Sequence, residues 1–319
     1  MSERPVQKPY VYFIVGPTAS GKTAVSIDIA ERINAEIISA DSIQIYKDLD
    51  IGSAKPSPDE LRRIRHHLVD FVDVTDTRFN VAKYRKDALD AIFDITGRGK
   101  RALVVGGTGL YVNSLVFPLD FSAAPPDDKL RRKLTELEQN KPGTLHRMLY
   151  DIDPKTADRL HSNDTKRIIR AIEIYEQTGK RPSDSVGDFS NSRGEDIPIN
   201  PIIVGINTDR PTLYKRIEIR VDRMLESGLL DEVDRLVERG IDPSVPALQG
   251  LGYKQLLMYR RGELTYEEAV ELIKRDTRRF AKRQISWFKR DARIRWLDPA
   301  QYVDIADTIC DHFMTNTTN

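Results

Sequence analysis

The chain alternates short apolar runs with longer amphipathic segments. Runs rich in β-branched and aromatic residues predict buried strands at Tyr10–Val15, Glu36–Ala40, Arg101–Val105 and Pro201–Ile206. Between them, a helical pattern extends from the capping residue Asn80 to about residue 95, and another covers residues 22–33. Strands that alternate with helices of this length predict an α/β fold, in which a parallel sheet has helices on both faces.

The pattern changes near Pro118, and the segment up to Lys180 has no convincing strand. Helices are predicted there over residues 127–139, 142–150 and 164–177. A loop rich in Gly, Ser and Asp follows at Ser183–Glu195, after which the chain returns to the sheet. We therefore expect a core of residues 1–120 and 200–319 that carries a mainly helical insertion domain, residues 121–199.

Composition and charge are those of a globular protein. Of the 319 residues, 31% are charged and 39% are hydrophobic, which argues against a disordered or membrane-spanning chain. Cys310 is the only cysteine, so neither an internal disulfide nor a cysteine-ligated zinc site is expected. The segment Met1–Pro9 is polar and lacks the apolar core of a signal peptide. We expect a cytoplasmic monomer without membrane contact, and interpret the pair His66-His67 as ordinary surface or substructure.

A phosphate-binding loop follows the first predicted strand. It has the pattern G-x-x-x-x-G-K-T and reads Gly16-Pro17-Thr18-Ala19-Ser20-Gly21-Lys22-Thr23. Between a strand and a helix, such a loop turns successive N–H groups toward phosphate oxygens at the positive end of the helix. Lys22 adds a positive charge, and the Thr23 hydroxyl is suited to bind Mg²⁺. The loop predicts a bound di- or triphosphate, but it does not specify the reaction.

Two further features are expected at the same sheet edge, where ligands of open α/β sheets bind. Asp41 follows the second predicted strand and has three interpretations: orientation of Mg²⁺, a general base, or the N-cap of a helix. The third strand runs into Gly106-Gly107-Thr108-Gly109. These glycines indicate either a backbone that passes close to a ligand or a tight turn.

Several longer segments resemble one enzyme family. They read GPTASGKT (16–23), ISADSIQIYKDLDIGSAKP (38–56), VVGGTGLYV (104–112), NDTKRIIRAIEIY (163–175), GLGYKQL (250–256) and AKRQISWF (281–288). In this order and over almost the whole chain, they resemble the tRNA dimethylallyltransferases. The resemblance implies a P-loop NTPase-like core with a helical insertion. It also implies transfer of a dimethylallyl group from dimethylallyl diphosphate to N6 of the adenosine 3′ to the anticodon, position 37 of tRNA.

The resemblance also implies roles for individual residues. Asp41 would be the general base, Thr108 would lie near the reacting atoms, and Arg220 would assist the diphosphate held by Lys22 and the loop. Mg²⁺, bound at Thr23, would be the cofactor. The implied contacts to the anticodon stem-loop of tRNA are Asp41, Ser42, Ile43, Gln44, Thr108, Arg131, Lys166, Arg167, Arg170, Gln249, Gly252, Tyr253 and Lys254. Lys282 and Arg283, in a run of basic residues near the end of the chain, are expected to contact tRNA as well. Some relatives carry arginine at the positions of Gln249 and Lys254.

The last part of the chain is helical to about Arg290 and then has a short predicted strand at Arg293–Leu297 and a final helix. Residues 274–295 hold ten Lys or Arg and two acidic residues, with aromatic side chains between them. Such a helix either follows an RNA backbone or is a solvated amphipathic helix. We expect a mixture, in which Phe280, Trp287 and Phe288 face the core and the basic side chains face RNA.

Three alternatives have other requirements. A small-molecule kinase on the same core would not need the polybasic helix. An adenylate prenyltransferase that modifies free AMP or ATP would not need the long insertion either. A non-enzymatic RNA-binding protein would not need Lys22, Thr23 and Asp41 intact. Since no Cys–His finger follows the core in this sequence and no basic transit segment is visible, we expect the bacterial form of the family, with an organellar form as the alternative.

Overall fold

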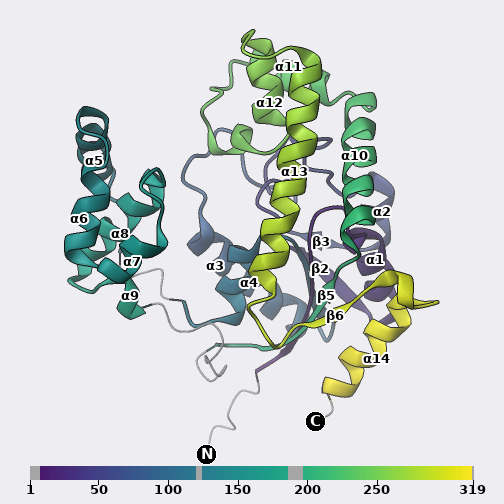
Figure 1. The fold of residues 1–319 in the computed structure, drawn as a ribbon. Coiled ribbons are helices and arrows are strands. Elements are labelled where there is room, and N and C mark those ends of the chain that lie inside the picture. Colours follow the sequence, from purple (N-terminus) through teal and green to yellow (C-terminus); the bar gives the residue numbers. More distant parts are fainter. Residues whose placement is uncertain (1–7, 120–123, 186–196, 318–319) are drawn as a thin grey trace, which may run out of the picture. The chain divides into compact units, whose positions relative to one another are not determined.

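The computed structural model describes residues 8–119, 124–185 and 197–317 (Figure 1). The chain forms two compact units. The larger, here called the core unit, comprises residues 1–117 and 194–319, and the helical unit comprises residues 118–193. The predicted loop at Ser183–Glu195 lies outside the described residues from residue 186 onward. Its first three residues, 183–185, form the end of a short helix.

The core unit is built on a parallel sheet. Its described part has six strands in the order β3-β2-β4-β1-β5-β6, every pairing is parallel, and the predicted α/β fold is therefore confirmed. The strands are β1 (Tyr10–Val15), β2 (Ala35–Ser39), β3 (His66–His67), β4 (Arg101–Gly106), β5 (Asn200–Ile206) and β6 (Arg295–Leu297).

The histidine pair forms the edge strand β3, with both side chains partly buried, so of the two interpretations substructure is confirmed. His67 contacts the Glu36 carboxylate over 2.8 Å between its Nε2 and Oε2. Glu36 is almost fully buried and is also bound by Arg98 and Lys100. Burial opposes ionisation, but these hydrogen bonds, above all those from Arg98, hold the pKa of Glu36 far below its ordinary value. This charge cluster closes the sheet edge on the side of β3.

Helices cover both faces of the sheet. In the described part of the core unit the helices are α1 (Lys22–Arg32), α2 (Pro58–Arg63), α3 (Val81–Gly97), α4 (Gly109–Val116), α10 (Arg210–Glu226), α11 (Leu229–Glu238), α12 (Tyr253–Arg260), α13 (Tyr266–Phe288) and α14 (Ile305–Thr317), with 3-10 turns at Pro246–Gln249 and Pro299–Gln301. The predicted cap Asn80 accepts hydrogen bonds from the first amides of α3. Helices α1 and α14 pack on one face, and α3 and α4 pack on the other (Figure 1).

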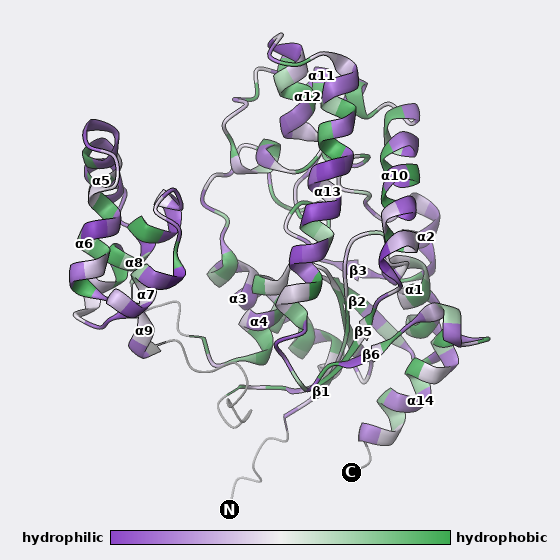
Figure 2. Cartoon of the chain, viewed as in Figure 1, coloured by the Kyte–Doolittle hydropathy of each residue, from purple (hydrophilic) through white to green (hydrophobic). Residues whose placement is uncertain are grey.

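The core unit has two main apolar clusters relevant to the site. The strands, α1 and α14 form one, and the strands are accordingly hydrophobic in Figure 2. Helices α10 to α13 enclose the other with the segment after β2, around Tyr46, Leu49 and Tyr253. The carboxyl ends of the strands lie between these clusters. Among the described residues, no helix is both long and apolar enough to cross a bilayer.

The helical unit contains only helices in its described part, as the sequence pattern predicts. They are α5 (Asp128–Asn140), α6 (Thr144–Ile152), α7 (Pro154–Arg159), α8 (Thr165–Thr178) and α9 (Pro182–Ser185). Their apolar faces enclose a small cluster centred on Leu145 and Leu149. Helices α7 and α9 were not predicted, because they are too short for a helical period to be recognised. The second helix was predicted to begin too early, because Gly143 adopts a left-handed conformation with φ 85° just before α6.

Candidate active site

The phosphate loop joins β1 to α1 in a conformation suited to an anion. Gly16 lies against β5, and a Cβ there would come within 2.2 Å of the Ile206 carbonyl oxygen. Gly21, at the start of α1, has φ 91°, which favours glycine. No side chain caps α1, and its first turn has no acidic residue. The N-terminal amides of the helix therefore remain available to a phosphate.

Lys22 is folded back onto this loop. Its Nζ donates a hydrogen bond to the Pro17 carbonyl oxygen over 2.7 Å. Loss of water around the ammonium, reinforced by the positive charge of Arg220 and opposed by Asp41, lowers the pKa of Lys22 to about 7. A negative charge bound in the loop would therefore stabilise the protonated form of Lys22.

Arg220 reaches the same place from α10. Among the described residues it has no ion-pair or hydrogen-bond partner, although most arginines of the core unit have one. Burial lowers its pKa, and the negative charge of Asp41 acts in the opposite direction. An unpaired guanidinium beside Lys22 is a suitable partner for a diphosphate.

A cavity of about 1050 Å³ connects these groups. The phosphate loop and α10 line one part, and the ends of β2 and β4 line another. Asp41, Gln44 and the glycines 106 and 107 belong to its wall. The cavity therefore joins an anion-binding loop to a carboxylate at the sheet edge, as the positions of the strands in the sequence predict.

Asp41 caps a turn rather than a helix, since the next helix begins only at Pro58. Its Oδ1 accepts hydrogen bonds from the amides of Ile43 (2.8 Å) and Gln44 (3.3 Å). Its Oδ2 accepts none from any residue that the structure describes. The helix-cap interpretation is wrong, and one carboxylate oxygen is left for chemistry.

Thr108 is tied to the turn that Asp41 caps. Its Oγ1 accepts a hydrogen bond from the Ser42 amide over 3.0 Å and lies 3.3 Å from the Ser42 hydroxyl. Thr108 stands at the N-cap position of α4 without capping it. The hydroxyl therefore serves the β2 edge and brings Thr108, Ser42 and Asp41 together.

The glycines around Thr108 are explained by packing within the protein. A Cβ on Gly106 would lie 2.2 Å from the Ala40 carbonyl oxygen, and one on Gly107 would lie 2.2 Å from Nε2 of Gln284. A Cβ on Gly109 would lie 2.2 Å from the Trp287 ring. The close approach of the Ala40 backbone and of two side chains of α13 is therefore sufficient to require glycine at all three positions.

Gln44, predicted to contact tRNA, has a side chain held at both ends. Its Oε1 accepts from the Ser39 hydroxyl over 3.1 Å, and its Nε2 donates to the Ala54 carbonyl oxygen over 2.9 Å. Ile43 packs against the apolar cluster under α11 and α12. Of the two, only Gln44 lines the cavity wall near Asp41.

The family model described as IPP transferase matches residues 44–291. The chain belongs to the IPP transferase family.

Relatives and solved structures agree with this family. The chain is 50% identical over 293 residues to a tRNA dimethylallyltransferase of Acetivibrio thermocellus and 45% identical over 298 residues to one of Pelotomaculum thermopropionicum. These matches cover 92% and 93% of both chains, respectively. A full-length tRNA isopentenylpyrophosphate transferase of Bacillus halodurans matches with TM-score 0.71 and 36% identity, over 98% of this chain and 99% of that one. A eukaryotic dimethylallyltransferase acting on tRNA matches with TM-score 0.79 and 30% identity, over 97% and 80%.

The polybasic helix of this IPP transferase, α13, carries both ion-paired and unpaired basic side chains. Lys274 and Arg278 are paired with acidic residues of α10, over 2.7 and 2.6 Å. Lys282, Arg283 and Lys289 are exposed and have no acidic partner among the described residues. The N-terminal basic residues thus hold α13 to α10, whereas the later ones remain available to an external anion.

The aromatic residues of α13 follow the prediction only in part. Phe288 is buried in the core, as expected. Phe280 is only partly buried and lines the cavity of the site, so its placement in the core was wrong. Trp287 is half-buried, and its ring packs so closely against Gly109 that a Cβ there would clash with it.

The predicted contact segment at Gln249–Lys254 requires a correction. Gln249 and Lys254 are exposed, but Gly252 and Tyr253 are buried, Tyr253 completely. The Tyr253 hydroxyl donates a hydrogen bond to Oε1 of Glu232 over 2.6 Å. As a side-chain contact to RNA, Tyr253 was therefore predicted wrongly, since its ring is part of the core unit's interior.

In the helical unit, Arg131 and Arg170 surround a buried acid. Arg131 makes two hydrogen bonds of 2.8 Å to Glu173, and Arg170 makes one of 2.5 Å. Burial alone would raise the pKa of Glu173, but these guanidinium contacts and the Asp127 amide keep it below its ordinary value. Lys166 and Arg167 are exposed. Predicted RNA contacts thus include two arginines with a structural role in this unit.

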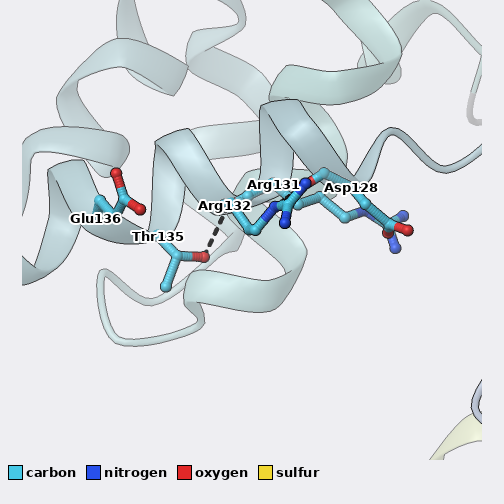
Figure 3. Close-up of a pocket in the computed structure, with 5 residues that line it drawn as sticks. All are labelled: Asp128, Arg131, Arg132, Thr135 and Glu136. Carbon is cyan, nitrogen blue, oxygen red and sulfur yellow. Dashed lines mark hydrogen bonds between the residues drawn. The ribbon is translucent and has the colours of Figure 1, made fainter.

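A shallow depression lies on α5 beside Arg131 (Figure 3). Its volume is about 540 Å³, and it is lined by Asp128, Arg131, Arg132, Thr135 and Glu136. Acidic and basic side chains alternate in it, so its charge does not single out a phosphate.

Two residues of the site, Gln284 and Glu232, were not predicted from the sequence. Gln284 of α13 contacts the phosphate loop, and Glu232 of α11 accepts hydrogen bonds from three amides of the loop at residues 50–52. Both are polar side chains at buried helix positions. That combination is visible in the helical period of the sequence and is a signal for a buried hydrogen-bonded group.

Proposed function

We propose that the chain transfers the dimethylallyl group of dimethylallyl diphosphate to N6 of the adenosine at position 37 of tRNA. The products are N6-isopentenyladenosine and diphosphate. The observation that carries the proposal is the single cavity that joins the phosphate loop, Lys22 and Arg220 to the unpaired oxygen of Asp41. The family membership of the chain and the names of its relatives support the same reaction.

On the donor side, the bond between the allylic carbon and the diphosphate oxygen breaks. Negative charge then grows on the leaving diphosphate. The loop amides, Lys22 and Arg220 surround this charge in a partly dry cavity, where fixed dipoles and charges act more strongly than in water. They stabilise the transition state more than the bound donor.

On the acceptor side, the exocyclic amine of adenine is a weak nucleophile, because its lone pair is conjugated with the ring. As N6 bonds to the allylic carbon, it must lose one proton. Asp41 Oδ2 is the acceptor for that proton, while Oδ1 keeps the turn in place. General bases of this kind typically contribute ~10²–10⁴-fold to the rate. Thr108, held beside Ser42, would contact the base near N6.

Mg²⁺ fits the donor side. The Thr23 side chain is exposed at the start of α1, and among the described residues no three His, Cys, Asp or Glu side chains converge on a metal position. Mg²⁺ commonly takes one or two protein oxygens together with phosphate oxygens and water. Thr23 would hold the ion, which would supply charge neutralisation for the diphosphate.

The tRNA must present its adenosine outside the base stack, which costs on the order of a few kcal/mol. Lys282 and Arg283 of α13, and Lys289 at its C-cap, are exposed basic residues suited to phosphate contacts. Lys166, Arg167, Gln249 and Lys254 are exposed as well, so we retain them as proposed contacts. We further propose that the chain works as a monomer in the cytoplasm, where its tRNA substrate is found.

The experiment offers purified protein Mg²⁺, radiolabelled dimethylallyl diphosphate and one acceptor, either unmodified tRNA or AMP. We expect label in tRNA and none in AMP. Label in AMP alone would make the chain an adenylate prenyltransferase. No label in either, with consumption of ATP and a small acceptor, would make it a kinase, and binding of tRNA without any turnover would leave an RNA-binding protein.

A further inference from the structure

One buried side chain connects helix α13 to both halves of the site. Gln284 is 6% exposed. Its Oε1 accepts a hydrogen bond from the Thr18 amide in the phosphate loop over 2.9 Å. Its Nε2 donates to the Gly107 carbonyl oxygen, after β4, also over 2.9 Å. A single amide thus bridges the loop that would hold the donor and the turn that precedes Thr108.

The orientation of this amide is fixed by chemistry. The Thr18 N–H can only donate, and the Gly107 carbonyl can only accept, so the oxygen must face Thr18 and the nitrogen must face Gly107. The nitrogen also occupies the space that a Cβ on Gly107 would need, at 2.2 Å. Neither an acid in its ionised form nor an apolar side chain of the same size would satisfy both partners.

The hydrogen-bonded connection continues to the catalytic carboxylate. Thr108 follows Gly107, and its hydroxyl holds the Ser42 amide. Ser42 in turn follows Asp41, whose Oδ1 closes the same turn. An unbroken chain of covalent and hydrogen bonds therefore leads from the phosphate loop through Gln284 to Asp41. Every hydrogen bond in it is 3.0 Å or shorter.

Helix α13 is seated on the β4–α4 turn at a second point. Trp287, one helical turn after Gln284, fills the space beside Gly109, where a Cβ would come within 2.2 Å of its ring. Lys282 and Arg283, immediately before Gln284, are exposed. The helix that offers basic side chains to solvent is thus held firmly against both segments of the cavity wall.

We propose that Gln284 is a positioning residue, which fixes the phosphate loop at the correct distance from Asp41 and Thr108. The inference rests on the proposed function, because it concerns the same cavity. Without Gln284, the Thr18 amide loses its partner and the loop can shift relative to the acceptor side. Displacements of about 1 Å in such sites can reduce rates by ~10²-fold.

The test compares Gln284→Leu with the unchanged protein. Titration calorimetry with inorganic diphosphate and Mg²⁺, without tRNA, measures the loop alone. Prenyl transfer to tRNA measures the alignment. We expect diphosphate affinity to fall about tenfold, and kcat to fall on the order of a hundredfold at saturating donor. Gln255→Leu is the matched control. It removes another buried glutamine with two hydrogen bonds, to Gly252 and Asp276, and should lower Tm without changing diphosphate affinity.

Gln284→Glu supplies a signature that a merely structural role would lack. A protonated carboxyl group can accept from Thr18 and donate to Gly107, like the amide, whereas the ionised form cannot donate. We expect the diphosphate affinity of this variant, taken relative to the unchanged protein at each pH, to recover as pH falls from 8.5 to 5.5. Since ionisation of the buried acid beside Gly107 is disfavoured, recovery should begin above the ordinary pKa of glutamate.

The outcomes separate this inference from the proposed function. Unchanged diphosphate affinity and kcat in Gln284→Leu would overturn the positioning role, even with full transfer to tRNA by the unchanged protein. The same would follow if Gln255→Leu lowered diphosphate affinity equally, or if Gln284→Glu gained nothing at low pH. If the unchanged protein binds diphosphate but transfers no prenyl group, the proposed function fails. Weaker diphosphate binding by Gln284→Leu would then still support positioning of the loop.

Discussion

The Nζ of Lys22 lies 2.7 Å from the carbonyl oxygen of Pro17, so the lysine of the phosphate loop is bound to its own backbone. Removal of its ammonium from water and the nearby charge of Arg220 lower its pKa to about 7. The unbound site therefore contains two cationic groups close together, one of which is easily deprotonated. A diphosphate in the cavity would reverse this situation and favour the protonated lysine.

Donor binding should therefore be coupled to proton uptake. At pH 8, most Lys22 side chains of the unbound protein are neutral, since the pKa is about 7, and binding of diphosphate should protonate them. Calorimetry in buffers of different ionisation enthalpy should detect close to one additional proton taken up compared with Lys22→Met, which controls for the protons of diphosphate itself. Affinity should weaken as pH rises above 7. Equal proton uptake by both proteins would contradict this prediction.

The lowered pKa of Lys22 also makes the free energy of unfolding depend on pH, in a direction that can be stated. The pKa of Lys22 is lower in the folded protein than its ordinary 10.5, so between about 7 and 10.5 the unfolded chain binds more protons at this position. The contribution of Lys22 to the free energy of unfolding therefore rises with pH across that window. Compared with Lys22→Met, the unchanged protein should gain stability between pH 7 and pH 9.

Asp41→Asn separates the two functions of this side chain. Asparagine keeps an oxygen for the amides of Ile43 and Gln44 but cannot accept the proton of N6. We expect kcat for prenyl transfer to fall by ~10²–10⁴-fold, with Tm and tRNA affinity close to those of the unchanged protein. Asp41→Ala should lose the same activity and also some stability, about 1 kcal/mol, because the turn loses its acceptor.

Substantial turnover by Asp41→Asn would return Asp41 to a role in the turn alone. A fall in Tm as large as that of Asp41→Ala would mean that the asparagine oxygen does not replace Oδ1. Single-turnover kinetics with prebound tRNA separate a loss in the chemical step from a loss in binding.

The exposed basic residues of α13 predict salt-dependent RNA binding. Lys282→Ala combined with Lys289→Ala should weaken tRNA affinity and reduce the slope of log affinity against log salt by about 1 to 2. Kd measured between 50 and 200 mM KCl, roughly the range over which such effects are large, checks this. Lys274→Ala is the matched control, since Lys274 is already paired with Asp222 over 2.7 Å. An unchanged slope in the double variant would make α13 a solvated amphipathic helix.

Much of the sheet was predictable, because its central strands are short, apolar and bounded by turn residues. The boundaries of β1 agree with the prediction, and those of β4 differ by one residue. The edge strand at His66–His67 was missed, since two residues carry no period and its pairing depends on Glu36 and Arg98 far away in sequence. A local sequence pattern predicts a strand that is buried on both faces. It does not predict a two-residue edge strand, whose pairing depends on residues distant in the sequence.

The site was predictable where chemistry is written into a motif and less so where a side chain acts through packing. The phosphate loop and Asp41 follow strands, so the end of each strand fixes their position. Tyr253 was misplaced, because a tyrosine beside an exposed lysine at a helix start looks the same in sequence whether it faces solvent or the core. Its burial is decided by Gly52, where a Cβ would lie 2.5 Å from the tyrosine ring.

Tyr253→Phe tests this reassignment. The Tyr253 hydroxyl stays protonated and remains a hydrogen-bond donor, because burial and the adjacent Glu232 raise its pKa. Glu232 also accepts from the amides of Asp50, Ile51 and Gly52, so it remains partly satisfied after loss of the hydroxyl. We expect the free energy of unfolding to fall by about 2 kcal/mol, the value of one buried hydrogen bond to a charged group. Affinity for tRNA, measured well below Tm, should not change.

Lys254→Ala is the complement, because Lys254 is the next residue and is exposed. It should leave Tm unchanged and weaken tRNA binding if this segment meets the RNA backbone. Tyr253→Phe is thus expected to lower stability but not tRNA affinity, and Lys254→Ala to lower tRNA affinity but not stability. If Tyr253→Phe weakened tRNA binding without lowering Tm, the ring would have to leave the core to reach RNA, and the interior role assigned to it would be wrong. If both variants changed neither quantity, the buried bond between Tyr253 and Glu232 would have to be replaced by water at no cost, which its 2.6 Å length and complete burial oppose.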